Sequence, residues 1–221
     1  PRISSIVGES KEKTEKLLSK STELSICMSC AVGFGIAAIA RVFVPLFFGE
    51  GYEKCVNLLV LFVPVLFVKS LSNVVDQQYL IPAKCDNQYT LAVTGGAIVN
   101  LICNGLLIPQ LGSVGATLGT LMAELSVLIV SAHCAKKEIR FFRMFSRYSY
   151  YLLLGLIMFI AVRFFDSYSH IERSFIRLIL MIMIGGGVYS LLCLTVWLKV
   201  KEKSVFGSIL ISLSKKGAIR K

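Results

Sequence analysis

The sequence predicts an all-α membrane protein, a polytopic bundle of about six transmembrane helices. Apolar residues make up 55% of the 221-residue chain and charged residues only 17%, against roughly 45–50% and about 25% in soluble domains. The mean hydropathy of +0.73 excludes a disordered chain, which has too little apolar content to fold. Six apolar stretches are long enough to cross about 30 Å of hydrocarbon as helices: 24–47, 56–81, 89–110, 113–133, 148–165 and 174–198.

Each of these stretches must be helical, because lipid offers no partner to an unpaired backbone amide. A membrane-spanning barrel would show ~10-residue segments of alternating polarity, and the sequence has none. Proline and glycine mark the ends of the first two spans: Pro45 and the turn 49–51 close the first, and Pro82 ends the second. Pro64 lies inside the second span, where it predicts a kink because it lacks an amide donor.

The third and fourth spans form a predicted antiparallel hairpin. Pro109 and Gly112 leave room only for a tight turn between them. Gly115 and Gly119 match the small-x3-small pattern, and Gly96 adds a small residue on the third span. Small residues let helix backbones approach closely, so we expect these glycines to serve packing.

The distribution of lysine and arginine predicts the orientation. The net charge of +11 would suggest a nucleic-acid partner in a soluble protein. Here only Lys54 and Arg173 lie in the loops of one side. Eighteen others lie in the segments of the opposite side, 1–23, 82–88, 134–147 and 199–221. By the positive-inside rule those segments are cytoplasmic, which removes the main support for nucleic-acid binding.

These boundaries divide the chain into five parts. A cytoplasmic segment, 1–23, precedes four transmembrane helices over 24–133, and a basic cytoplasmic loop, 134–147, leads to two further helices over 148–198. The basic tail 199–221 mixes apolar and cationic residues, which predicts an interfacial helix on the inner leaflet. The chain begins at Pro1 without a methionine or a targeting peptide, so we expect it to be a fragment with an upstream part.

Two opposite charges lie near the middle of predicted spans. Lys69 is about 11 residues, or roughly 17 Å, from either end of 56–81, and Glu124 is near the middle of 113–133. A charge at the bilayer centre costs about 2.5–3.5 kcal/mol on insertion scales. We therefore expect the two side chains to pair.

Further polar residues lie on the same helix face as Lys69. Asn73, Asp76 and Gln77 follow it at i+4, i+7 and i+8, and this face cannot contact lipid. Two interpretations remain open: an interhelical polar contact that only holds the bundle together, or a hydrated substrate or ion pathway. In the second case the candidate pathway residues also include residues on the other spans: Asn100, Asn104, Glu124 and Arg41.

Three arginines lie in the outer halves of the spans. Arg41 is ~9 Å from the outer end of the first span, within reach of the interface by snorkelling. Arg163 and Arg177 lie close to the outer ends of their helices, and we expect them to anchor these ends at the interface.

Signals for covalent chemistry are missing from the sequence. Cys27 and Cys30 form a lone C-x2-C pair without a second pair or a histidine nearby, so we expect buried structural side chains rather than a metal site. His133 and His170 fall on opposite sides of the membrane, and there is no phosphate-binding loop. The sequence predicts a protein that is not an enzyme and has no metal or cofactor.

Several segments resemble the Wzx-type polysaccharide flippases of the multidrug/oligosaccharidyl-lipid/polysaccharide exporter superfamily. The resemblance covers 1–134, and beyond it only the hydropathy agrees. The segments are Pro1-Arg2-Ile3-Ser4, Leu46-Phe47-Phe48-Gly49-Glu50-Gly51-Tyr52, Leu71-Ser72-Asn73 to Gln77, Leu80-Ile81-Pro82, Gly96-Ala97-Ile98-Val99-Asn100-Leu101-x2-Asn104-x2-Leu107-Ile108-Pro109, Gly112-x2-Gly115-Ala116 and Ala123-Glu124.

The resemblance implies the C-terminal part of a transporter with 12–14 helices in two bundles. It implies that the protein moves an undecaprenyl-pyrophosphate-linked oligosaccharide across the bacterial cytoplasmic membrane for surface polysaccharide (capsule) synthesis, by alternating access. The expected partners are this lipid-linked oligosaccharide, membrane lipids, the N-terminal bundle of the same chain and a coupling ion, H⁺ or Na⁺, carried by Asp76 or Glu124. No nucleic acid is expected.

Three other functions stay open. A multidrug exporter of the same superfamily would take cationic cargo, which Lys69 disfavours unless Glu124 neutralises it. A polysaccharide-assembly enzyme such as a polymerase would carry a large outer loop, whereas the outer loops here have about ten residues or fewer. A membrane scaffold is disfavoured by the charges at mid-span.

Overall fold

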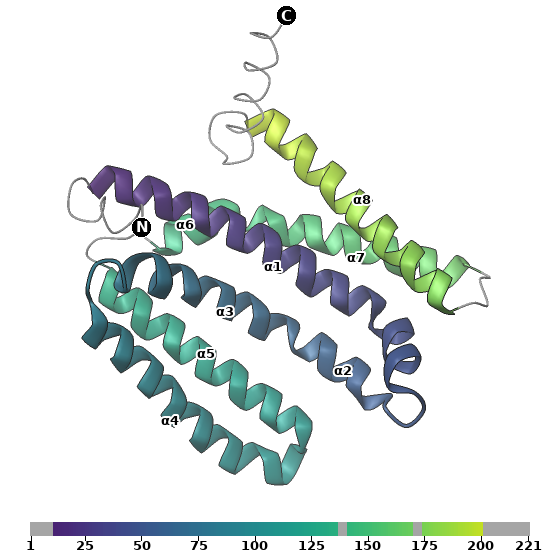
Figure 1. The fold of residues 1–221 in the computed structure, drawn as a ribbon, viewed down its shortest axis with the longest axis horizontal. Helices are drawn as coiled ribbons and strands as arrows, with labels where there is room; N and C mark the ends of the chain where they lie inside the picture. The colour runs from purple at the N-terminus through teal and green to yellow at the C-terminus, as the bar shows by residue number, and fades with distance from the viewer. Residues whose placement is uncertain (1–10, 137–140, 170–173, 201–221) are drawn as a thin grey trace, which may run out of the picture.

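The computed structural model describes residues 11–136, 141–169 and 174–200 (Figure 1). These ranges contain helices joined by short turns and no strand. In chain order the elements are α1 (Lys11–Phe48), α2 (Lys54–Leu61), α3 (Val63–Val75), the π-helical turn η1 (Asp76–Leu80), α4 (Asp86–Leu111), α5 (Ser113–Ala135), α6 (Phe141–Tyr148), α7 (Tyr150–Tyr168) and α8 (Ser174–Val200).

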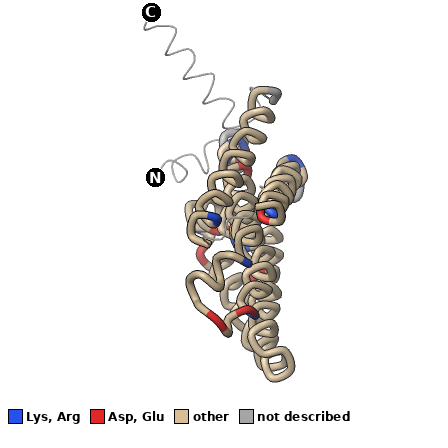
Figure 2. The backbone as a smooth tube through the Cα atoms, turned by 90° about the vertical axis from the view of Figure 1, so that its right-hand side faces the viewer, with Lys and Arg blue, Asp and Glu red and all other residues tan. Residues whose placement is uncertain are grey.

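Within the described ranges, six helical segments are long and apolar enough to cross a membrane: α1, α2 through η1, α4, α5, α6 with α7, and α8. Large apolar side chains cover the outside of the bundle, for example Leu101 at 76% and Met183 at 69% exposure. Charged residues are sparse along the tube (Figure 2). The predicted fold class is therefore confirmed, and the chain is a multi-pass membrane protein.

The helices pack in the order α4, α5, α3, α1, α7, α8 from one edge of the bundle to the other (Figure 1). The largest cluster of buried apolar residues lies between α1, α3 and α7, around Leu18, Ile26, Val75 and Tyr151. At the far edge α8 diverges from α1 toward the end of the bundle at which α1 begins (Figure 1). Helix α8 therefore lies close to α1 at one end of the bundle and farther from it at the other (Figure 1).

The second predicted span is interrupted where proline predicts a kink. Phe62 separates α2 from α3, and Pro64 lies in the first turn of α3. The ring is tolerated there because the first amides of a helix have no intrahelical acceptor. The π-helical turn η1 was not predicted: its end is marked by hydrogen bonds of Ile81 N to Asp76 O (3.0 Å) and Cys85 N to Leu80 O (2.8 Å).

The hairpin of α4 and α5 is confirmed, together with its close packing. Gly112 turns the chain with φ +56°, a conformation that glycine adopts at little cost. A Cβ on Gly115 would overlap the carbonyl oxygen of Leu107, and a Cβ on Gly119 would overlap the side chain of Asn104. The glycines predicted to serve packing therefore lie at the helix contact.

The predicted turn at 49–51 is also present. Gly49 and Gly51 have φ values of +83° and +92°, and the amide of Gly51 donates a hydrogen bond to Glu53 Oε1 at 3.1 Å. Hydrogen bonds from its own backbone amide and from that of Gly51 lower the pKa of Glu53. The Glu53 carboxyl therefore stays ionised at the N-terminus of α2.

Two boundaries differ from the predicted ones. Helix α1 begins at Lys11 rather than at 24, and Glu23, assigned to a cytoplasmic segment, is fully buried in the bundle. The predicted loop 134–147 contains α6, whose Phe145 packs edge-on against Phe67 at a centroid distance of 6.1 Å. The interfacial helix predicted in the tail lies outside the described residues.

Candidate functional site

A polar cavity of about 300 Å³ lies between α3 with η1, α4 and α5. Six of the eight candidate pathway residues line it: Lys69, Asn73, Asp76, Gln77, Asn100 and Glu124. The four-residue spacing on α3 and η1 brings three of them to one wall, and the hairpin supplies the opposite wall. Tyr89, which the sequence did not single out, also lines the cavity.

The predicted pair of mid-span charges is confirmed. Lys69 Nζ lies 2.9 Å from Glu124 Oε1, with the lysine side chain 50% exposed and the glutamate 18% exposed. The ammonium therefore faces the open side of the cavity while the carboxylate is held closer to the protein. Glu124 Oε2 is buried and has no hydrogen-bond partner, which leaves one oxygen of the pair available for a proton or ligand.

Asp76 is the second acid of the cavity and the first residue of η1. It is 4% exposed, and its Oδ1 has no hydrogen-bond partner. On α5, the helix that packs against η1, Ser131 is fully buried and its hydroxyl faces the Asp76 carboxyl, although the two do not form a hydrogen bond of standard geometry. Buried polar groups are ordinarily paired, so the unpaired Oδ1 of Asp76 is unusual. Because π-helical turns are frequent at functional sites, Asp76 stays a candidate site residue.

The two asparagines of α4 differ in role. Asn104 Nδ2 donates a hydrogen bond to Asn100 Oδ1 at 2.9 Å, which fixes the amide of Asn100 at the cavity. Asn104 itself does not line the cavity but packs on Gly119 of α5. Its expected place in the pathway is thus replaced by a place in the helix contact, one turn further along α4.

Arg41 does not reach the cavity. It is exposed on α1, and the cavity is lined only by residues of α3, η1, α4 and α5. The structure therefore separates Arg41 from the six candidates that line the cavity.

Arg163 and Arg177 form an ion-pair cluster that the sequence did not predict. Both arginines bind the carboxylate of Asp166, with Arg163 Nη1 to Oδ2 at 2.9 Å and Arg177 Nε to Oδ1 at 2.8 Å. Arg177 also donates to the backbone carbonyl of Asp166 at 2.7 Å. The cluster ties α7 to α8 at one end of the bundle. The i,i+3 spacing of Arg163 and Asp166 is typical of an ion pair on one helix face, so the sequence could have predicted this pair but not the contact with Arg177.

A second polar network is buried at the other end of the bundle. Tyr151 donates a hydrogen bond to Glu23 Oε1 at 3.0 Å and accepts one from Trp197 Nε1 at 2.8 Å. It links α1, α7 and α8. The hydropathy pattern places Glu23 at the end of the predicted cytoplasmic segment, so the sequence does not predict its burial.

Among the described residues, no cysteine or histidine lines the polar cavity. Cys27 and Cys30 are buried on α1, and the backbone carbonyl of Cys27 accepts a hydrogen bond from Tyr189 at 2.7 Å. In the described ranges no group of histidine, cysteine and acidic residues could hold a metal ion. His133 contacts Lys136 at 3.0 Å, and His170 lies outside the described residues.

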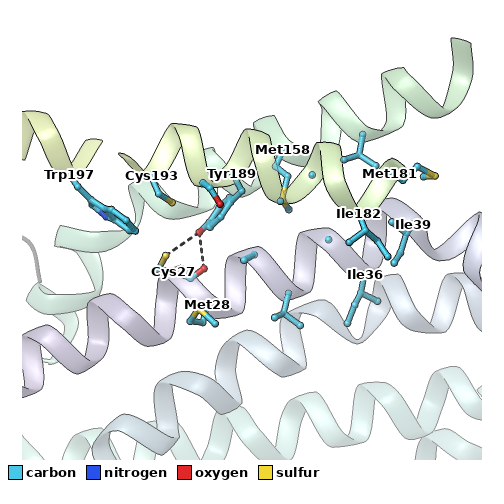
Figure 3. Close-up of a pocket in the computed structure, with 17 residues that line it drawn as sticks. Cys27, Met28, Ile36, Ile39, Met158, Met181, Ile182, Tyr189, Cys193 and Trp197 are labelled. Atoms are coloured by element: carbon cyan, nitrogen blue, oxygen red, sulfur yellow. Dashed lines mark hydrogen bonds between the residues drawn. The ribbon is translucent and has the colours of Figure 1, made fainter. Parts of the chain in front are cut away.

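A larger, apolar cavity of about 630 Å³ lies between α1, α7 and α8 (Figure 3). It shares no lining residue with the polar cavity, so the bundle offers two chemically distinct concave surfaces.

No protein-family model, curated protein or solved structure matches the chain. The fold and the polar cavity define the class: an all-helical, multi-pass membrane protein with a charged pair and amide side chains around an open cavity between its helices.

Proposed function

We propose that the chain is part of a Wzx-type flippase that moves an undecaprenyl-pyrophosphate-linked oligosaccharide across the bacterial cytoplasmic membrane. In this proposal both ends of the chain are cytoplasmic, as the distribution of lysine and arginine indicates. The observation that carries the proposal is the Lys69–Glu124 ion pair on the wall of the polar cavity.

The chemistry of the cavity suits such a substrate. A pyrophosphate and a sugar chain need hydrogen bonds and a positive charge to replace water inside the membrane. Asn73, Gln77 and Asn100 offer amide donors and acceptors, and the half-exposed ammonium of Lys69 can turn from Glu124 to a phosphate. A purely structural polar contact would not require an open, polar-walled cavity of about 300 Å³.

Coupling to an ion gradient belongs to the same proposal. When Lys69 binds a phosphate, Glu124 loses its partner, and a buried carboxylate without a partner takes up a proton or a cation. Asp76 is the alternative carrier, because its buried Oδ1 has no partner. The N-terminal bundle implied by the resemblance would supply the other wall of the pathway.

A multidrug exporter is the second candidate, and a specific observation favours it. The cavity holds two acids, Asp76 and Glu124, against one lysine, and Glu124 neutralises that lysine. A cavity with both acids ionised would favour cationic cargo. Two points favour the flippase over the exporter. The sequence resembles the flippases, and the lysine of the cavity is more exposed than the acids.

The test uses the complete gene in its host. Depletion should cause lipid-linked oligosaccharide to accumulate and surface polysaccharide to disappear, with unchanged efflux of cationic dyes. The accumulated oligosaccharide should be inaccessible to an external glycan-binding probe, since a polymerase defect would leave it exposed on the outer leaflet.

Variants then test the cavity itself. Lys69→Ala should reproduce the accumulation, whereas Lys54→Gln, an exposed lysine outside the cavity, should transport normally. Full transport by both Lys69→Ala and Glu124→Gln would reduce the charged pair to a structural contact. Impaired dye efflux with normal polysaccharide would favour the exporter.

A further inference from the structure

The apolar cavity between α1, α7 and α8 is a groove along the edge of the bundle (Figure 3). Its walls are aliphatic and thioether side chains, among them Met28, Met158, Met181 and Ile182. Tyr189 lies against Cys27 at the Trp197 end of the groove, and Ile39 lies at the opposite end (Figure 3). Its volume of about 630 Å³ is large for a gap left by imperfect packing.

The length of the groove matches one leaflet. Along α1 its lining runs from Cys27 to Ile39, which is about 18 Å at the rise of an α-helix. The hydrocarbon of one leaflet is about 15 Å deep. Trp197 lies at the Cys27 end, and tryptophan prefers the membrane interface. The groove therefore spans from one interface to the bilayer middle, as a phospholipid acyl chain does.

Two lysines lie beyond the Cys27 end of the groove. Lys20 precedes Cys27 by seven residues and Ala31 by eleven, and Lys16 precedes Cys27 by eleven, so both lie on the face of α1 that lines the groove. Both are exposed, and neither pairs with a carboxylate of the described chain. Lys20 lies about 10 Å along the axis from Cys27, close to the depth of the headgroups.

We propose that this groove binds an anionic glycerophospholipid, with one acyl chain between α1 and α8 and the phosphate against Lys20 and Lys16. The lipid comes from the leaflet at the end of the bundle where α1 begins, the inner leaflet in the orientation proposed above. The site is separate from the polar cavity and does not depend on what the protein transports.

The headgroup is tested with the purified full chain in phosphatidylethanolamine vesicles that contain a phosphatidylglycerol carrying a photoreactive group on its acyl chain. Labelling should map to α1 and α8, and unlabelled phosphatidylglycerol should suppress it more than phosphatidylethanolamine does. Lys16→Gln and Lys20→Gln should each lower labelling about fivefold, the effect of one cation near an anionic surface. Lys54→Gln is the matched control. Equal labelling of all three variants would overturn the proposal.

The groove is tested with two neighbouring glycines. A Cβ at Gly186 or at Gly187 would meet nothing within 4 Å, but only Gly186 lines the groove. Gly186→Phe should therefore abolish labelling of α1 and α8 while Gly187→Phe leaves it unchanged. Equal labelling of both variants overturns the proposal. Stronger labelling after removal of 204–221 would also overturn it, because the chain's own tail would then be the occupant. Displacement of the label by a polyprenyl pyrophosphate but not by phosphatidylglycerol would overturn it as well.

Discussion

At the scale of single residues, the polar side chains of this protein are concentrated at a few shared contacts inside an apolar bundle. Lys69 meets Glu124, Asp166 meets two arginines, and Glu23 meets Tyr151. The cost of burying an ionised group is offset only when its partner is present. Removal of one member of a contact should therefore destabilise the protein by leaving the remaining members buried without a partner.

The Lys69–Glu124 pair allows a double-mutant cycle. Lys69→Ala leaves a mostly buried carboxylate without its partner, and Glu124→Ala leaves an ammonium without one. We expect the double variant to be more stable than the sum of the single losses predicts, by about 0.5–3 kcal/mol. The value should fall at the low end, because half of the lysine side chain is exposed and screened. Unfolding in detergent measures it, and additive losses would mean that the pair is not coupled.

The Asp166 cluster should fix the end of α8. Asp166→Ala removes the acceptor of both arginines and leaves two cations side by side, so we expect a loss of about 2–4 kcal/mol and faster hydrogen exchange at the start of α8. Arg163→Gln should cost less, because Arg177 keeps its bonds to Asp166. Equal losses in the two variants would contradict the central role of the aspartate.

At the scale of elements, the hairpin of α4 and α5 is the most closely packed unit, and the chain provides its own controls. Gly119→Ala places a methyl group against the Asn104 side chain, whereas Gly115→Ala places one against the Leu107 backbone. A side chain can be shortened and a backbone cannot. We therefore expect Asn104→Ala to rescue Gly119→Ala but not Gly115→Ala.

The rescue is measured as thermal stability in detergent. Each single variant should lose roughly 1–3 kcal/mol as an overpacked contact, and Gly105→Ala, which meets nothing within 4 Å, should lose none. If Asn104→Ala rescued both glycine variants, or neither of them, the contact would not have the geometry described here.

At the scale of the whole molecule, the prediction concerns orientation. Alternating spans place the turn at 49–51 on one side and residues 84 and 136 on the other. In a cysteine-free background, Glu50→Cys should react with a membrane-impermeant maleimide in intact cells. Lys84→Cys and Lys136→Cys should react only after permeabilisation. The reverse pattern would contradict both the proposed orientation and the leaflet assigned to the phospholipid.

The sequence by itself determined the six membrane-spanning segments, the hairpin, the interruption of the second span next to Pro64 and the Lys69–Glu124 pair. It could do so because hydropathy, proline and the depth of a charge along a helix are one-dimensional properties. Depth alone was enough to match the lysine with its glutamate, since two opposite charges at mid-span have few other partners.

Only the tertiary structure decided which side chains share a surface. Arg41 and Asn104 do not line the cavity, and Glu23 is buried, because the rotation of each helix against its neighbours determines whether a residue faces a cavity, a contact or the outside. For the same reason the sequence does not predict the ion pairs of Asp166. The π-helical turn at Asp76 and the apolar groove are likewise absent from the sequence pattern. A local change of helix type and the divergence of α8 from α1 arise from packing between elements far apart in the chain.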